Sequence, residues 1–223
     1  MATPNIVMTR IDERLVHGQG QLWVKSLGVN TVIVANDQAS QDAMAQTLMK
    51  TVIPKEVAMR FYSVQKVIDI IHKANPAQTI FLIVKDCKDA LRLVEGGVPI
   101  KQINIGNIHN CEGKEKVTRS IFLGAEDKAA LKEMIEKYNV EFNTQTTPSG
   151  SDGSVLVDIK NYLYEIKEYA NYIVTGRNHR SMDSILLLRD VVGYFYEPCF
   201  SFKFRCWYCM WRFKNSIAMW SNR

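Results

Sequence analysis

The chain has 223 residues, 47% of them apolar, which is enough to bury one substantial hydrophobic core. Its formal net charge is +5, but residues 166–223 carry all of this excess, because residues 1–165 contain 19 basic and 19 acidic side chains. A balanced domain without a basic stripe argues against nucleic-acid binding, and no run of 18 apolar residues is present that would span a membrane.

The first half of the chain alternates between short apolar runs and segments with helical spacing of apolar residues. Thr31–Ala35 is almost wholly apolar, as is typical of a strand buried on both faces of a parallel sheet. Gly28 is a candidate helix C-cap, and Ser40 and Ser63 are candidate N-caps. The predicted strands are residues 5–11, 31–35, 57–62 and 79–84, and the predicted helices begin near Gln19, Ser40 and Ser63.

The same rhythm continues in the second half. It predicts a helix from Asp86, a strand over 102–105, a helix over 126–138, a strand over 140–145 and a closing helix over 155–165. Residues 116–123 are expected to form an antiparallel strand, because too few residues precede them for a crossover helix. The predicted fold class is therefore α/β, with an open, mostly parallel sheet, helices on both faces and an antiparallel strand near the edge.

His17 lies in the connection between the first predicted strand and the first predicted helix, where open α/β sheets place ligands. Arg10 and Arg14 flank it, and a nucleophilic histidine beside guanidinium groups suits a phosphohistidine intermediate. Asn36-Asp37 and Gly106-Asn107 also follow strands, so we expect them at the same edge. The alternative interpretation is that His17 is a solvated loop histidine and that Arg10 and Arg14 are ordinary surface arginines.

The run from Arg10 to Gln19, RIDERLVHGQ, resembles the phosphorylation-site signature of IIB components of the mannose/sorbose-type bacterial sugar phosphotransferase system. Further matches follow in the same order, at Val34–Asp37, Leu93–Pro99 and Ile103–His109. The resemblance covers about residues 5–165, which we expect to be the IIB phosphocarrier domain, with 166–223 as an atypical tail. The details at Val34–Asp37 and Gly106–His109 are most similar to the N-acetylgalactosamine branch.

The resemblance implies a role for each residue of the site. His17 would carry the phosphate, Arg14 would stabilise the transferring group, and Arg10 and Asp12 would shape the loop. Asp12 would orient Arg14 or instead hydrogen-bond the imidazole and so select the attacking nitrogen, and family precedent suggests the nitrogen nearest the side-chain stem. The expected phosphate-binding residues are Gly18 and Gln19 at a helix N-terminus, together with Asn36, Asp37 and Asn107.

The family resemblance also implies partners. Phosphate would arrive from a phosphorylated IIA protein and leave for a sugar, N-acetylgalactosamine or a related amino sugar, taken up through membrane IIC and IID proteins. The chain would be cytoplasmic, peripherally associated with the membrane through these partners, and a homodimer is left open. No metal or organic cofactor is implied. The rival hypothesis is a non-catalytic α/β module that binds an anion or a phosphoprotein.

Two further residues lie near the expected site, Gly20 and His109. Gly20 stands where the family more often has a branched apolar residue, and a glycine there would loosen the first helical turn by about 1 kcal/mol relative to alanine. His109 lies in a loop at the expected active edge, where the resemblance places it at the rim of the site and not as the phosphate acceptor.

The tail has a different character. Residues 200–213 mix aromatic and cationic side chains without helical or strand periodicity, and Cys206-Trp-Tyr-Cys209 is half of a zinc motif without a second pair. One interpretation is a basic aromatic arm that docks on a membrane or on the transporter. We favour the other, a peptide appended by a frameshift near Glu165, because local propensity, pattern and capping stop agreeing there.

Overall fold

The structure, a computed structural model, describes residues 3–150 and 155–164. The predictions about the tail, including the Cys206-Trp-Tyr-Cys209 motif, lie outside the described residues.

Six strands form one sheet in the order β3-β2-β4-β1-β5-β8, and every neighbouring pair is parallel. These strands are β1 (Ile6–Asp12), β2 (Thr31–Ala35), β3 (Ala58–Tyr62), β4 (Ile80–Val84), β5 (Gln102–Asn107) and β8 (Glu141–Asn143). The connecting helices are α1 (Gly18–Leu27), α2 (Ala43–Val52), α3 (Val64–Ile70), the short 3-10 helix η1 (Ile71–Lys73), α4 (Cys87–Glu95) and α5 (Ala125–Tyr138). The predicted α/β architecture is confirmed.

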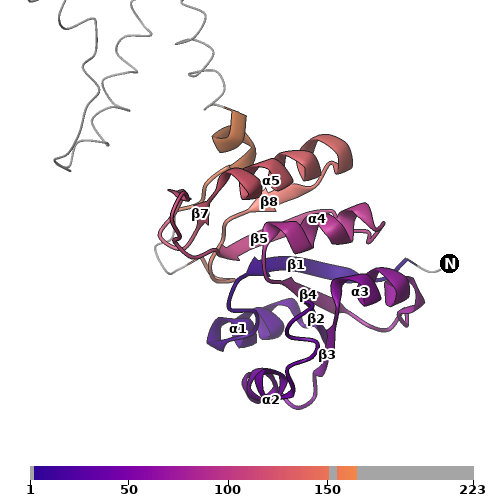
Figure 1. The fold of residues 1–223 in the computed structure, drawn as a ribbon. Coiled ribbons are helices and arrows are strands. Elements are labelled where there is room, and N and C mark those ends of the chain that lie inside the picture. Colours follow the sequence, from indigo (N-terminus) through magenta and orange to yellow (C-terminus); the bar gives the residue numbers. More distant parts are fainter. Residues whose placement is uncertain (1–2, 151–154, 165–223) are drawn as a thin grey trace, which may run out of the picture. The chain divides into compact units, whose positions relative to one another are not determined.

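The helices cover both faces of the sheet, with α1 and α2 on one face and α3, α4 and α5 on the other (Figure 1). Alternate residues of the central strand β4 point to these two layers. Ile80 and Leu82 join the cluster that contains α3, α4 and α5, and Phe81 and Ile83 join the cluster beneath α1 and α2. Each strand of the centre is thus buried on both sides, which explains its continuous apolar sequence.

The helix caps agree with the sequence in most places and differ in one. Ser63 and Asp86 cap α3 and α4 as predicted, and Gly28 ends α1 with a φ of 60°. Ser40 does not cap α2. Asp42 does so instead, because its carboxylate accepts a hydrogen bond from the Ala45 N–H at 2.9 Å, whereas the Ser40 hydroxyl donates to the Asp37 carbonyl.

Residues 116–123 were predicted as a single strand. They are folded back on themselves, so that β6 (Glu115–Lys116) and β7 (Phe122–Leu123) form a separate two-stranded antiparallel sheet. A bridge from Ile108 to Ile121 connects this hairpin to the segment that follows β5. At the other boundary, residues 159–164 are helical and 155–158 are not, so the predicted closing helix begins later than expected.

The loop after β1 lies at a switch in the topology. Its chain continues into α1 on one face, whereas the neighbouring strands β4 and β5 continue toward α4 and α5 on the opposite face (Figure 1). In open α/β sheets a crevice forms at such a point, beyond the carboxyl ends of the strands.

Among the described residues, none of the helices is long and apolar enough to cross a membrane.

Candidate active site

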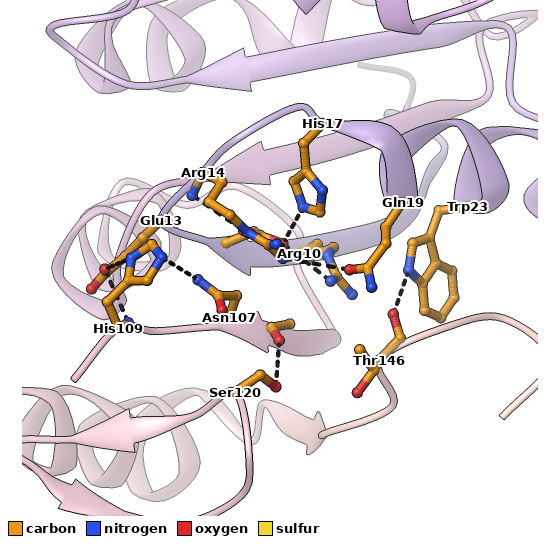
Figure 2. A network of polar contacts seen from close by, with 12 residues as sticks. Arg10, Glu13, Arg14, His17, Gln19, Trp23, Asn107, His109, Ser120 and Thr146 are labelled. Atoms are coloured by element: carbon orange, nitrogen blue, oxygen red, sulfur yellow. Dashed lines mark hydrogen bonds and ion pairs between the residues drawn. The ribbon is translucent and has the colours of Figure 1, made fainter. Parts of the chain in front are cut away.

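Asp12, the last residue of β1, is the centre of the polar network at this edge. Its fully buried carboxylate accepts hydrogen bonds from Arg10 Nη2 at 3.1 Å and from Arg14 Nε at 3.2 Å. The Nε2 atom of His17 lies 2.9 Å from Asp12 Oδ2. Arg10, Arg14 and His17, which the sequence predicted to act together, therefore converge on one carboxylate (Figure 2).

A tight turn brings these side chains back onto Asp12. The Leu15 N–H donates to the Asp12 carbonyl at 2.8 Å, and the Arg14 N–H donates to the Asp12 carboxylate at 3.1 Å. Leu15 has a φ of 55°, a left-handed conformation that non-glycine residues seldom adopt. The turn is thus held by Asp12 through both its backbone and its side chain, in a conformation that Leu15 alone would not favour.

The charge of Asp12 favours one tautomer of a neutral His17 imidazole. Burial pushes the pKa of the Asp12 carboxyl upward, but hydrogen bonds from His17 and Arg14 and the charge of Arg10 outweigh burial and hold this pKa at about 2. An ionised carboxylate only accepts hydrogen bonds, so the proton of the neutral imidazole resides on Nε2. The Nδ1 atom, nearest the side-chain stem, then carries the free lone pair. Asp12 makes both contacts that were considered for it, to Arg14 and to the imidazole, and its role in selecting the attacking nitrogen stays a prediction.

Arg10 is 3% exposed and is held from several directions. Its guanidinium donates to Asn104 and to Asp12 and lies 5.6 Å from the centre of the Trp23 ring. Burial lowers the pKa of Arg10, while the neighbouring Asp12 charge opposes that shift. Because Arg10 is enclosed, it supports Asp12 from behind and does not present its guanidinium to solvent.

Gly106 in β5 makes room for that guanidinium. A Cβ at Gly106 would lie 2.1 Å from Arg10 Cζ, a distance at which something must shift. Trp23 closes the other side, and its indole N–H donates to the Thr146 carbonyl at 3.2 Å. Sequence reasoning did not assign roles to Gly106, Trp23 or Asn104. The predicted strand ended at residue 105, whereas β5 continues to Asn107 and so contains Gly106. A glycine inside a strand often marks close approach of another group.

Gly18 and Gln19 begin α1, close to the predicted start of a helix, and their role in binding an anion stays a prediction. His17 occupies the N-cap position and makes no side-chain capping bond. The Gly20 N–H donates to the His17 carbonyl at 2.7 Å, whereas the N–H groups of Gly18 and Gln19 have no acceptor among the described residues and are available to an anion. The Gln19 side chain accepts from Arg14 Nη2 at 3.4 Å and so belongs to the same network.

Asn107 and His109 form a second network with Glu13, beside the first. The Glu13 carboxylate lies 2.6 Å from His109 Nδ1 and 3.4 Å from Lys114 Nζ. Asn107 Nδ2 is 3.3 Å from His109 Nε2, and the Asn107 carbonyl accepts from the Glu13 N–H. His109 is more than half exposed, at the rim position that the resemblance implied. Glu13 was not predicted.

Asn36 and Asp37 are not joined to the hydrogen-bond network of His17. Asn36 donates to Asp89 at 3.1 Å and accepts from the Ala39 N–H at 3.0 Å. Asp37 accepts from Arg92 at 2.9 Å and from the Val64 N–H at 3.0 Å. These bonds fix the loop and the starts of α3 and α4. The expectation that the pair binds phosphate stays a prediction.

The part of the chain that the structure describes contains no group of three His, Cys, Asp or Glu side chains arranged to hold a metal ion. The two cysteines in this part, Cys87 and Cys111, are both free.

Comparison with known proteins gives this arrangement a family. The family described as "PTS system sorbose subfamily IIB component" matches residues 6–167. The chain belongs to this family. Residues 168–223 lie outside the match.

Individual relatives agree with this assignment. The N-acetylgalactosamine-specific phosphotransferase enzyme IIB component 2 of Escherichia coli is 45% identical over 147 residues, which are 66% of this chain and 93% of that protein. The crystal structure of an N-acetyl-galactosamine IIB component from Streptococcus pyogenes is 61% identical, with a TM-score of 0.70 over 73% of this chain and 99% of that one. The IIB domain of the Klebsiella pneumoniae sorbose permease is 30% identical, with a TM-score of 0.62 over 74% and 97% of the two chains.

Proposed function

We propose that His17 Nδ1 accepts a phosphoryl group from a phosphohistidine of a IIA partner and passes it to a sugar taken up through membrane IIC and IID partners. In the first step the donor's P–N bond breaks as the bond from phosphorus to His17 Nδ1 forms. In the second step the hydroxyl oxygen of the sugar replaces Nδ1, and the proton of the hydroxyl is released. The observation that carries the proposal is the His17 Nε2 contact with the buried, ionised Asp12.

The surroundings of His17 suit a phosphoryl group with developing negative charge. Catalysis of such transfer consists mainly of positioning and charge stabilisation. Arg14, anchored to Asp12 through Nε and Nη2, would stabilise the equatorial oxygens, and the N–H groups of Gly18 and Gln19 would donate to one of them. Arg10 would act indirectly by keeping Asp12 charged and in place. Asn107 lies beside Arg14 on a neighbouring cleft, where it remains a candidate contact.

The proposed sugar is N-acetylgalactosamine or a related amino sugar. This proposal rests on the N-acetylgalactosamine specificity of the Escherichia coli and Streptococcus pyogenes relatives, which are 45% and 61% identical to the chain. The partners are proposed on the same basis of family, and they would bring the chain to the cytoplasmic side of the membrane.

Labelling by a phosphoenolpyruvate-driven relay would test the proposal. The full chain should acquire acid-labile, base-stable phosphate. His17→Gln should acquire none and should still fold, because Arg10 and Arg14 continue to bind Asp12 and a partly exposed loop imidazole contributes little packing. His109→Gln is the matched control and should be labelled normally. Reversible phosphate binding without covalent label would support the non-catalytic module instead.

We propose that residues 1–165 are the complete functional domain and that 166–223 contribute nothing to transfer. A chain ending at Glu165 should fold and accept phosphate at His17 at the rate of the full chain. Slower transfer, or loss of binding to the IIA or membrane partner, would assign a function to the tail.

A further inference from the structure

A cleft of about 710 Å³ lies next to the proposed phosphate-carrying loop. It is lined by the loop after β1, the start of α1, the end of β5, the β6–β7 hairpin, and Thr146 and Val155 in the chain after β8. Figure 2 shows residues from these elements, Arg14, Gln19, Asn107 and Ser120, with Thr146 nearby. Its volume lies in the range of clefts that bind small molecules.

Three cations line this cleft and no described carboxylate does. Arg14 comes from the loop after β1, and Lys116 and Arg119 come from the hairpin. Within the described residues, Lys116 and Arg119 have no carboxylate at ion-pairing distance, whereas the nearby Lys114 and Lys128 are paired with Glu13 and Glu115. Unpaired cations around one concave surface attract an anion and strengthen its binding.

On one side of the cleft the Arg14 side chain is held in place, and on the other side the backbone that carries Arg119 is. Arg14 is fixed by Asp12 through Nε and Nη2, which leaves Nη1 without a partner among the described residues. Across the cleft, Ser120, next to Arg119, accepts from the Ile108 N–H through its carbonyl at 2.9 Å and donates from its hydroxyl to the Gly106 carbonyl at 3.1 Å. The backbone that carries Arg119 is therefore attached to the end of β5, so less ordering is needed when a ligand binds.

We propose that this cleft binds a hexose-sized phosphate monoester, the product of transfer, with its dianion between Arg14 and Arg119. Guanidinium groups match phosphate oxygens geometrically, and the hydroxyl and amide groups of Thr118, Gln19 and Asn107 suit a sugar ring. The inference rests on the proposed function for the identity of the ligand. Its consequence is regulation, because a product that occupies Arg14 competes with the incoming phosphoryl group.

Calorimetric titration of the full, unphosphorylated chain with an N-acetylhexosamine 6-phosphate would test this site. Saturable binding is expected, and Arg119→Gln and Lys116→Gln should each weaken it about tenfold through loss of a charge-assisted contact. The matched control is Arg60→Gln, which removes an exposed arginine from β3 at the opposite edge of the sheet and should leave the affinity unchanged. Inorganic phosphate and the uncharged sugar should each bind more weakly than the ester.

Absence of saturable binding, or equal affinity of the unmodified chain and Arg119→Gln, would overturn the inference. Inorganic phosphate that binds as tightly as the ester would also overturn it, since the site would then recognise only an anion. The His17→Gln variant separates this result from the relay. This variant should bind the ester without carrying phosphate. If the unmodified chain is labelled at His17 but does not bind the ester, the proposed ester site is wrong and the proposed relay is unaffected.

Discussion

The loops after β1 and β2 begin at the same edge of the sheet, yet their polar side chains are used differently. After β1, Asp12 binds two arginines and His17. This leaves His17 Nδ1, Arg14 Nη1 and the N–H groups of Gly18 and Gln19 without partners among the described residues. After β2, the amide of Asn36 and the carboxylate of Asp37 are taken up by Asp89, Arg92 and backbone N–H groups. A loop at the carboxyl edge of the sheet can therefore bind or react with a ligand only where its polar groups are not already hydrogen-bonded within the protein.

The two aspartates also differ in their surroundings. Asp12 is completely buried, whereas the Asp37 side chain is 51% exposed. Charge pairs weaken as solvent enters, so the Asp37–Arg92 pair contributes little to stability and less at high salt. We expect the same substitution to have unequal effects in the two loops.

Exchange of arginine for lysine should give the largest difference between the two loops, measured as the rate of phosphoryl transfer. Arg14→Lys keeps the charge but loses the guanidinium fork that bridges Asp12 and a phosphoryl group, so single-turnover transfer should slow roughly a hundredfold. Arg92→Lys makes the same exchange at the Asp37 loop and should transfer at the normal rate. Rapid-quench labelling measures both rates, and equal rates would remove Arg14 from the mechanism.

Gly106→Ala should disturb the site indirectly, through the Arg10 guanidinium that binds Asp12. The new Cβ would meet the Arg10 guanidinium, which is fixed by Asn104, Asp12 and Trp23, so overpacking should cost about 2 kcal/mol and slow transfer by displacing Asp12. Denaturant unfolding and labelling measure the two effects. Gly18→Ala is the control for stability, since its Cβ would meet no atom within 4 Å. Equal stability of the two variants would show that Arg10 has room to move.

The acid dependence of stability should come from Asp12 more than from Asp37. The folded-state pKa of Asp12 is lowered from 3.8 to about 2, so its contribution is present above pH 3.8 and is lost as the pH falls through 2. That difference corresponds to roughly 2 kcal/mol. Between pH 4 and pH 2, Asp12→Asn should lose less stability than the unmodified chain, and Asp37→Asn should follow the unmodified chain closely. If the free energy of unfolding fell equally with pH in all three proteins, Asp12 would not be the main source of the acid dependence.

The fold was predictable because its signals are local. Continuous apolar runs identified β2 and β4, and cap residues such as Ser63 and Asp86 marked the starts of helices. The cap of α2 was misplaced because two oxygen-bearing residues, Ser40 and Asp42, stand close together, and only the backbone path decides which one reaches the N–H of the first turn. Residues 116–123 were misjudged because their pattern does not reveal the turn inside them.

The site was predictable where one segment supplies it. Arg10, Asp12, Arg14 and His17 fall within eight residues, so their convergence required only a turn. The support of Arg10 by Asn104 and Gly106 depends on the pairing of β1 with β5, which no local pattern specifies. Likewise, Asn36 looks suited to phosphate in the sequence, because nothing there shows that Asp89 binds its amide.

Asn36→Ala gives the smallest expected change and the most direct test of the contrast between the two loops. It removes the hydrogen bonds to Asp89 and from the Ala39 N–H, so it should cost about 1 kcal/mol of stability. Asp89 would lose a donor that holds its raised pKa down, so part of this cost should disappear at low pH, where Asp89 is protonated. Labelling of His17 should proceed at the normal rate under conditions in which the variant is fully folded. Slower labelling of the folded variant would show that the sequence-based prediction was correct and that Asn36 contacts phosphate despite its bonds within the loop.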